Sequence, residues 1–247
     1  MSGCFEQKFV MTASDVDRWQ RLRPSVLFRM LQEISIAHTE ALGAGRSKTL
    51  DKGVLWVVTR VRLEVERLPR YDERVILSSW PGETMRVIFP RYYQMETESG
   101  EILLRASSLW LLMNQKERHF VFPEELGVIV PGFVRGDELF QPESIVPPET
   151  QKSLFRKVAY SELDLNGHMN NTRYLDWLFD LFPASFHKEH TLRGVEINFS
   201  SETKPDATVE LRWKYSENEL FAKGFCDVEL FEAKLRFDDC KVKRTAV

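Results

Sequence analysis

The chain has 247 residues, a length that fits either one large domain or two small ones. Hydrophobic residues make up 43% and charged residues 29%, the balance of an ordinary folded protein with a sizeable core. A net charge of −3 offers no electrostatic basis for binding nucleic acid, and no apolar run reaches the roughly 18–20 residues that span a membrane.

The first half of the chain predicts a strand, one long helix and then a series of strands. Residues 5–17 read as a strand that leads into a turn. A helix is expected from Pro24 to Leu42, because Pro24 suits a first helical turn and Gly43 suits a stop. Its apolar face repeats at helical spacing and comprises Val26, Leu27, Met30, Leu31 and Ile34. Segments rich in β-branched and aromatic residues predict strands at residues 54–66, 74–80, 85–97, 102–114 and 119–122.

The second half repeats this order after a stretch rich in proline, glycine and acidic residues. A strand is expected at residues 152–160, a polar turn at 161–171 and a shorter helix at 171–183. Further strands are expected at residues 192–200, 208–215, 220–228 and 230–237. The resulting division is a first domain at residues 1–125, a linker at 126–150 and a second domain at 151–247.

Residues 61–77 and 195–211 correspond position by position without a gap. Both segments alternate apolar residues in the same places, and Asp72 lies over Asp206. A strand, one helix and a meander of strands is the plan of the hotdog unit, in which a sheet wraps a helix. The predicted fold class is therefore α+β, a tandem hotdog with two antiparallel sheets that each wrap a central helix. The alternative is a likeness of composition alone, which does not account for the shared helix position.

The densest polar cluster lies just before the second helix. Asp164, Asn166 and His168 alternate, so an extended segment would direct all three to one side. His168 is a candidate general base near neutral pH, and the free N–H groups of the following helix could stabilise an oxyanion. Asn170 or Asn171 is expected to cap that helix. The purely structural alternative is a capping turn with one solvated histidine.

Glu202 is the second candidate. A lone glutamate at the end of a strand is usually solvated, but the internal repeat adds information. The counterpart of Glu202 in the first half is Leu68. The counterpart of the cluster at residues 164–168 is the segment 17–21, which keeps Asp17 but lacks the asparagine and the histidine. One half is therefore equipped for chemistry and the other is not.

The segment DLNGHMNNTRYLDW at residues 164–177, with SSETKPD at residues 200–206, resembles the acyl-acyl carrier protein thioesterases of plants and bacteria. The likeness runs over nearly the whole chain. It implies an active site made by Asp164, Asn166, His168 and Glu202. Several plant members carry a cysteine at the position of Thr203, so the resemblance implies direct attack by water here rather than a cysteine nucleophile.

This resemblance implies hydrolysis of fatty acyl thioesters of acyl carrier protein, an acidic partner. Glu202, helped by His168 or Asn166, would activate a water molecule. Asp164 would fix the turn, and neither a cofactor nor a metal would take part. The acyl chain would lie in an apolar slot in the first half. The residues expected to contact the substrate are Met30, Leu31, Ile34, Asn170 and Thr203.

Three other functions remain open. An acyl-coenzyme A thioesterase would use the same site with a different entrance surface. A non-catalytic acyl-binding hotdog would need neither His168 nor Glu202, and a hotdog dehydratase would require a hydration motif that the chain lacks. The three scattered cysteines and the absence of a leader-like opening favour a cytoplasmic protein. A homodimer formed through exposed sheet edges also remains open.

Overall fold

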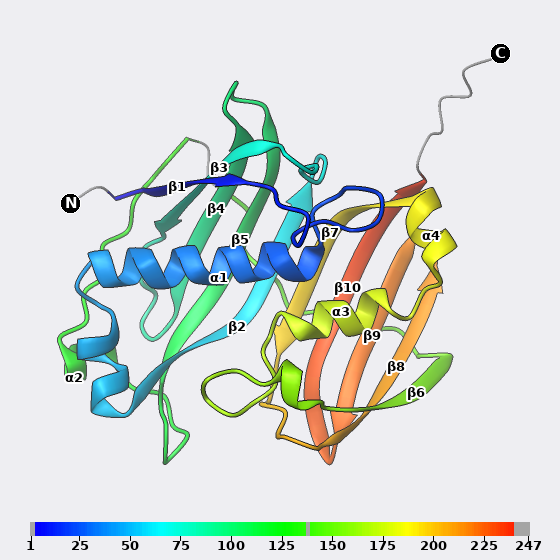
Figure 1. Ribbon diagram of the computed structural model, residues 1–247. Helices are drawn as coiled ribbons and strands as arrows, with labels where there is room; N and C mark the ends of the chain where they lie inside the picture. The colour runs from blue at the N-terminus through cyan, green and yellow to red at the C-terminus, as the bar shows by residue number, and fades with distance from the viewer. Residues whose placement is uncertain (1–2, 137–138, 240–247) are drawn as a thin grey trace.

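A computed structural model describes residues 3–136 and 139–239, which form one antiparallel sheet of ten strands (Figure 1). The strands are β1 (Phe5–Val10), β2 (Val54–Val65), β3 (Arg74–Pro81), β4 (Phe89–Thr97), β5 (Ile102–Asn114), β6 (Lys152–Lys157), β7 (His190–Phe199), β8 (Thr208–Ser216), β9 (Glu219–Cys226) and β10 (Val228–Asp239). Their order across the sheet is β1-β3-β4-β5-β2-β7-β10-β9-β8-β6.

The strand order shows that the molecule consists of two equivalent halves. The first half reads β1-β3-β4-β5-β2 from its edge to the centre, and the second reads β6-β8-β9-β10-β7. The halves meet where β2 pairs antiparallel with β7, from Arg60 opposite Asn198 to Glu64 opposite Gly194. The predicted tandem hotdog is thereby confirmed, and its two sheets are continuous with each other instead of separate.

Two helices lie across one face of the sheet (Figure 1). α1 (Pro24–Ala41) places Leu27, Leu31 and Ile34 in the core, and Gly43 follows its end with a φ of 72°. α3 (Arg173–Phe179) belongs to the second half and contacts α1. The short helical segments are η1 (Arg46–Lys48), η2 (Leu50–Lys52), α2 (Pro123–Leu126), η3 (Tyr160–Glu162) and α4 (Ala184–Glu189).

One hydrophobic core is shared by both halves. It contains Leu63 and Leu77 from the first half together with Val195 and Phe231 from the second, all with no exposed surface. Alternate strand residues point to opposite faces of a sheet, so the apolar alternation in residues 61–77 and 195–211 turns one set of side chains toward the helices. Because the core is shared, the two hotdogs pack as one unit.

The internal repeat extends to the backbone of a turn. Asp72 and Asp206, which correspond in the sequence, both adopt left-handed conformations, with φ values of 63° and 60°. Aspartate tolerates this conformation better than most residues, because its short polar side chain can bond locally. A composition-only likeness would not place the same residue in the same uncommon conformation.

The stretch expected as a linker packs against the first half. Val128 and Val130 are buried in a small second cluster with Val54 and Phe89. The described residues between α2 and β6 form no helix or strand. This stretch therefore lacks regular secondary structure, and apolar contacts hold its beginning against the first half.

Two predicted elements differ from the structure. Residues 119–122 form no strand, because only Phe120 bridges to Met113 before Pro123 begins α2. The helix expected at residues 171–183 is shorter, since α3 ends at Phe179 and Pro183 precedes a separate helix, α4. Within the described residues, no helix is long and apolar enough to cross a membrane.

Candidate active site

Asp164 organises the turn between η3 and α3. Its Oδ1 atom accepts backbone N–H bonds from Asn166 at 2.8 Å and from His168 at 3.3 Å. The Asp164 N–H donates to the His168 carbonyl at 2.8 Å, which closes the turn. Gly167 has a φ of 78°, a conformation that costs a residue with a side chain about 1 kcal/mol. These contacts of Asp164 are those of a turn-forming residue.

The imidazole ring of His168 faces the carboxylate of Glu202. The His168 Nε2 atom lies 3.5 Å from the Glu202 Oε2 atom. A backbone bond joins the two segments, since the Met169 N–H donates to the Thr203 carbonyl at 2.9 Å. The His168 Nδ1 atom is buried and has no hydrogen-bond partner in the described part of the chain. Buried polar atoms are rarely left unpaired, so this atom distinguishes His168 from a histidine with a purely structural role.

Glu202 is also held by an arginine from the other half of the chain. The Arg118 Nη2 atom lies 2.6 Å from Glu202 Oε2, and Arg118 Nη1 donates to Glu202 Oε1 at 3.0 Å. Sequence analysis missed this residue, since the segment that contains it reads as a charged surface. No local signal could have revealed it, because the contact joins residues 84 positions apart.

The start of α3 is held by the side chain of Asn170. The residue before the helix is Thr172, and Asn170 Oδ1 accepts bonds from the Thr172 N–H at 2.9 Å and the Thr172 hydroxyl at 2.8 Å. The Arg173 N–H donates to the Asn170 carbonyl at 2.9 Å. Asn170 therefore supplies the side-chain cap at the start of the helical turn that leads into α3, as expected, and Thr172 makes no side-chain cap bond of its own. Two amides at this end are occupied within the protein, which leaves fewer for an oxyanion.

Thr203 is a buried structural residue. Its side chain is 1% exposed, and its hydroxyl lies 2.6 Å from the hydroxyl of Tyr174 on α3. Burial raises the pKa of Tyr174 to about 12, so the phenol stays protonated. The pair fastens the segment after β7 to the helix beneath it. Thr203 is placed to support Glu202, and it lines none of the described pockets.

A pocket of about 300 Å³ opens beside the polar turn and extends into the first half. Asn166 and Leu165 of the second half line it, together with residues of α1, η1, η2, β2, β4 and β5. Its apolar lining includes Ile36, Leu55, Trp56, Phe89 and Trp110. The pocket therefore combines an apolar interior from one half with a polar edge from the other.

Only part of the expected slot lining contacts a pocket. Met30 and Ile34 lie in the core and line none of the described pockets. Leu31 lines a small cleft of about 30 Å³ together with Asn171 and Thr172. The face of α1 that lines the larger pocket carries Ser35 and Thr39 instead.

A buried arginine also lines the larger pocket. Arg91 is 6% exposed, and its guanidinium donates to His38 Nδ1 at 3.0 Å, Ser79 Oγ at 3.1 Å and Thr39 Oγ1 at 3.0 Å. Burial lowers the pKa of Arg91, and in the described part of the chain no carboxylate pairs with it. The pocket thus contains a cation that is solvated only by neutral groups.

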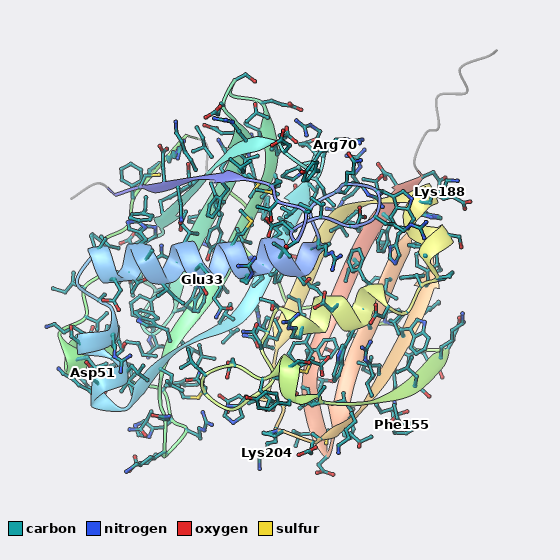
Figure 2. All side chains as sticks on the ribbon, in the orientation of Figure 1. Glu33, Asp51, Arg70, Phe155, Lys188 and Lys204 are labelled. Carbon is teal, nitrogen blue, oxygen red and sulfur yellow. The ribbon has the colours of Figure 1, made fainter. Side chains whose placement is uncertain are left out.

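The site lies at one end of the sheet, where segments of both halves meet. Lys204, which follows Glu202 by two residues, marks this end at the lower edge of Figure 2. No group of three or more His, Cys, Asp or Glu side chains among residues 3–136 and 139–239 is arranged to hold a metal.

The fold and the site define a tandem hotdog with an acid–histidine pair beside an apolar pocket. Residues 3–126 match the model of the acyl-ACP thioesterase N-terminal domain, and residues 147–228 match that of the acyl-ACP thioesterase C-terminal domain. The chain belongs to the acyl-ACP thioesterase family.

The chain is also similar in sequence to individual curated proteins. The chain is 28% identical over 221 residues to a chloroplastic palmitoyl-acyl carrier protein thioesterase of Gossypium hirsutum, covering 83% of this chain and 54% of that protein. The chain thus spans about half the length of the curated relative.

Solved structures share the fold. An acyl-ACP thioesterase of Bacteroides thetaiotaomicron superposes with a TM-score of 0.86 at 22% identity, covering 96% of this chain and all of that one. The 12:0-ACP thioesterase of Umbellularia californica gives a TM-score of 0.82 at 21% identity, with 97% and 99% coverage. At these identities the likeness shows the fold alone.

Proposed function

We propose that the protein hydrolyses fatty acyl thioesters of acyl carrier protein to a free fatty acid and the carrier thiol. The observation that carries this proposal is the pairing of His168 with Glu202 next to a pocket with an apolar interior. Asn166 connects the two, because it lines the pocket and lies two residues before His168. A thioester needs this combination: an apolar space for its chain and polar groups at its carbonyl.

The proposed reaction is a direct attack by water. Glu202 accepts a proton from a water molecule as its oxygen bonds to the thioester carbonyl carbon, with His168 helping to orient that water. The resulting oxyanion is stabilised by the side-chain amide of Asn166. The carbon–sulfur bond then breaks, and the proton passes to the departing thiolate.

Thr203 takes no chemical part in this proposal. Its hydroxyl bonds to Tyr174, and it is buried under the segment that carries Glu202. A hydroxyl in this position cannot reach a thioester in the pocket. A covalent route through this position is therefore set aside in favour of water.

The two halves would have different tasks. We assign the acyl-chain pocket to the first domain, residues 1–125, and the chemistry to the second, residues 151–247, with residues 126–150 as the connection. The carrier protein and a cytoplasmic location are part of the same proposal, and a homodimer is compatible with it. The family membership and the names of the relatives support the carrier protein as the partner.

The test is hydrolysis of acyl-carrier-protein thioesters from C8 to C18, beside the matching coenzyme A thioesters, by the wild type and His168→Ala. The expected result is preference for the carrier-protein series and a large loss of kcat in the variant, with an unchanged melting temperature. Faster turnover of the coenzyme A thioesters would instead assign the protein as an acyl-coenzyme A thioesterase. Binding of acyl chains without hydrolysis of either series would show that the protein is a non-catalytic acyl-binding protein.

A further inference from the structure

We infer that Arg118 is a positioning residue that orients the carboxylate of Glu202, so that the active site is built from both halves of the chain. This inference rests on the proposed function, because Glu202 is its proposed base.

The contact has the geometry of a clamp. Each carboxylate oxygen of Glu202 meets a different guanidinium nitrogen, Oε2 with Nη2 at 2.6 Å and Oε1 with Nη1 at 3.0 Å. Two parallel charge-assisted bonds fix the plane of a carboxylate as well as its position. Glu202 needs such a restraint, since its side chain is 36% exposed at the end of a strand.

The clamp also determines how Glu202 meets His168. The Oε2 atom that Arg118 holds is the same atom that lies 3.5 Å from His168 Nε2. Without the guanidinium, the carboxylate would be free to rotate away from the ring and toward solvent. Arg118 therefore acts through Glu202, with no contact to the pocket of its own.

The turn that carries Arg118 is fixed by its own hydrogen bonds. The Asn114 Oδ1 atom accepts N–H bonds from Lys116 at 2.9 Å and Glu117 at 3.0 Å, and the Arg118 N–H donates to the Asn114 carbonyl at 3.0 Å. Arg118 itself has a φ of 59°. These bonds hold the backbone of Arg118 in one conformation at the end of the turn that faces Glu202.

The consequence is a composite site. Glu202, His168 and Asn166 all belong to the second half, while Arg118, which holds Glu202, follows β5 of the first half. The second half alone would lack it.

The decisive variant is Arg118→Gly, because glycine removes the guanidinium and also suits the positive φ. We expect kcat toward acyl-carrier-protein thioesters to fall on the order of 100-fold with little change in KM. A small displacement of a reacting group from its productive position has an effect of this size. Added guanidinium ion, at concentrations too low to unfold the protein, should restore part of kcat in Arg118→Gly and have no such effect on the wild type or on Glu202→Gln. Arg118→Lys, which keeps the charge but loses the second bond, should remain impaired.

Arg86 offers a matched control. It is an exposed arginine of the first half with a φ of 58°, and it makes no ion pair in the described part of the chain. Arg86→Gly should keep the wild-type kcat. Full activity in Arg118→Gly, or a loss that guanidinium cannot reverse, would overturn the inference.

A second readout does not depend on turnover. The ring signal of His168 in a ¹H–¹³C NMR spectrum, identified by its absence in His168→Asn, should move in Arg118→Gly and return on addition of guanidinium. An unmoved signal would overturn the positioning role even if the protein is a thioesterase. If the His168 signal moves but the protein hydrolyses no thioester, the proposed function is rejected, while the positioning of Glu202 by Arg118 still holds.

Discussion

Arg62 and Glu196 are opposite each other where β2 pairs with β7, and they are also each other's counterparts in the internal repeat. A residue can face its own counterpart only on an axis that relates the two halves by a half-turn. The centre of the ten-stranded sheet is therefore an approximate two-fold axis. This is the arrangement that two separate hotdog subunits would adopt as a symmetric dimer.

The same axis relates the candidate site to a second pocket, of about 330 Å³, whose corresponding loop lacks the asparagine and the histidine of the candidate site. This pocket is lined by Asp17, Trp19 and Arg21, from the segment that corresponds to residues 164–168, and by residues of α3 and α4. The guanidinium of Arg21 pairs with Asp17 and donates to the carbonyls of His187 and His190. Charged groups in this pocket are thus engaged in holding the fold.

Replacing Gly167 by alanine should impair both stability and activity. Its φ of 78° costs alanine about 1 kcal/mol, and the turn that it closes carries Asn166 and His168. Urea denaturation and kcat/KM measure the two effects. Gly100→Ala is the matched control. Gly100 has a φ of 87° and open space around it, and it lies in the hairpin between β4 and β5, outside the candidate site. The control should lose similar stability and keep its activity; equal activity losses in both variants would contradict the prediction.

Asp164 should tolerate asparagine better than alanine. Its Oδ1 atom accepts two backbone N–H bonds, and the carbonyl oxygen of asparagine can accept the same bonds. Asp164→Ala should lose about 1 kcal/mol of stability and most of the activity, whereas Asp164→Asn should keep most of both. Thermal unfolding and steady-state kinetics on the two variants decide the question. A dead but stable Asp164→Asn would show that the charge itself takes part in the reaction.

Arg91→Met should shift the preference toward longer acyl chains. A hydrocarbon gains nothing from contact with a guanidinium, and methionine would replace that charge in the pocket with a flexible apolar side chain. Stability should fall by about 1–3 kcal/mol, because the buried Ser79 hydroxyl and the buried His38 Nδ1 atom lose the hydrogen bonds that Arg91 donates. Chain-length profiles from C8 to C18 provide the measurement, and an unchanged profile in a folded variant would refute it.

Thr203→Cys should remain active, and Thr203→Val should be less stable. Valine leaves the buried hydroxyl of Tyr174 without its partner, which costs about 1–3 kcal/mol. Cysteine keeps a weak hydrogen-bonding group, and an inhibitor of thiols should not abolish its activity, since water is the proposed nucleophile. Activity per folded molecule should be retained in both variants. Complete loss in a well-folded Thr203→Val would assign the hydroxyl a chemical role.

His187 should make stability depend on pH on the acid side. Burial lowers the pKa of His187 below its usual 6.5, and its ring stacks on Phe179. The unfolded chain then binds a proton at His187 more tightly than the folded protein does. The stabilisation that the neutral ring provides is therefore fully present above pH 6.5 and is lost as the pH falls below that value. His187→Phe should flatten the curve of unfolding free energy below pH 6.5. An unaltered slope would mean that another group causes the dependence.

Patterns within the sequence predicted the elements that rest on local chemistry. The alternation in residues 61–77 and 195–211 identified strands in both halves, and Pro24 and Gly43 bounded α1 closely. The Asp164–His168 turn was predictable because its bonds join residues at most four positions apart. The short helix at residues 173–179 was overestimated, since its apolar residues continue into Phe182 and obscure the break at Pro183.

The contacts between the two halves could not be predicted from local sequence patterns. Arg118 meets Glu202 only because β2 and β7 join the two sheets, and no residue near either one signals the other. The lining of the larger pocket could not be predicted from the sequence for a related reason. Helical spacing identified the most apolar face of α1, which packs in the core, whereas the pocket lies against the neighbouring face with Ser35 and Thr39.

The pairing of β2 with β7 inside one chain also changes what a mutation does. In a dimer of identical subunits, one codon sets the residue at both symmetric positions, and every substitution is made twice. Here each position of the pair has its own codon. One loop could therefore acquire Trp19 and Arg21 while its counterpart retained Asn166 and His168, and a pocket could be fitted to its ligand without disturbing its twin.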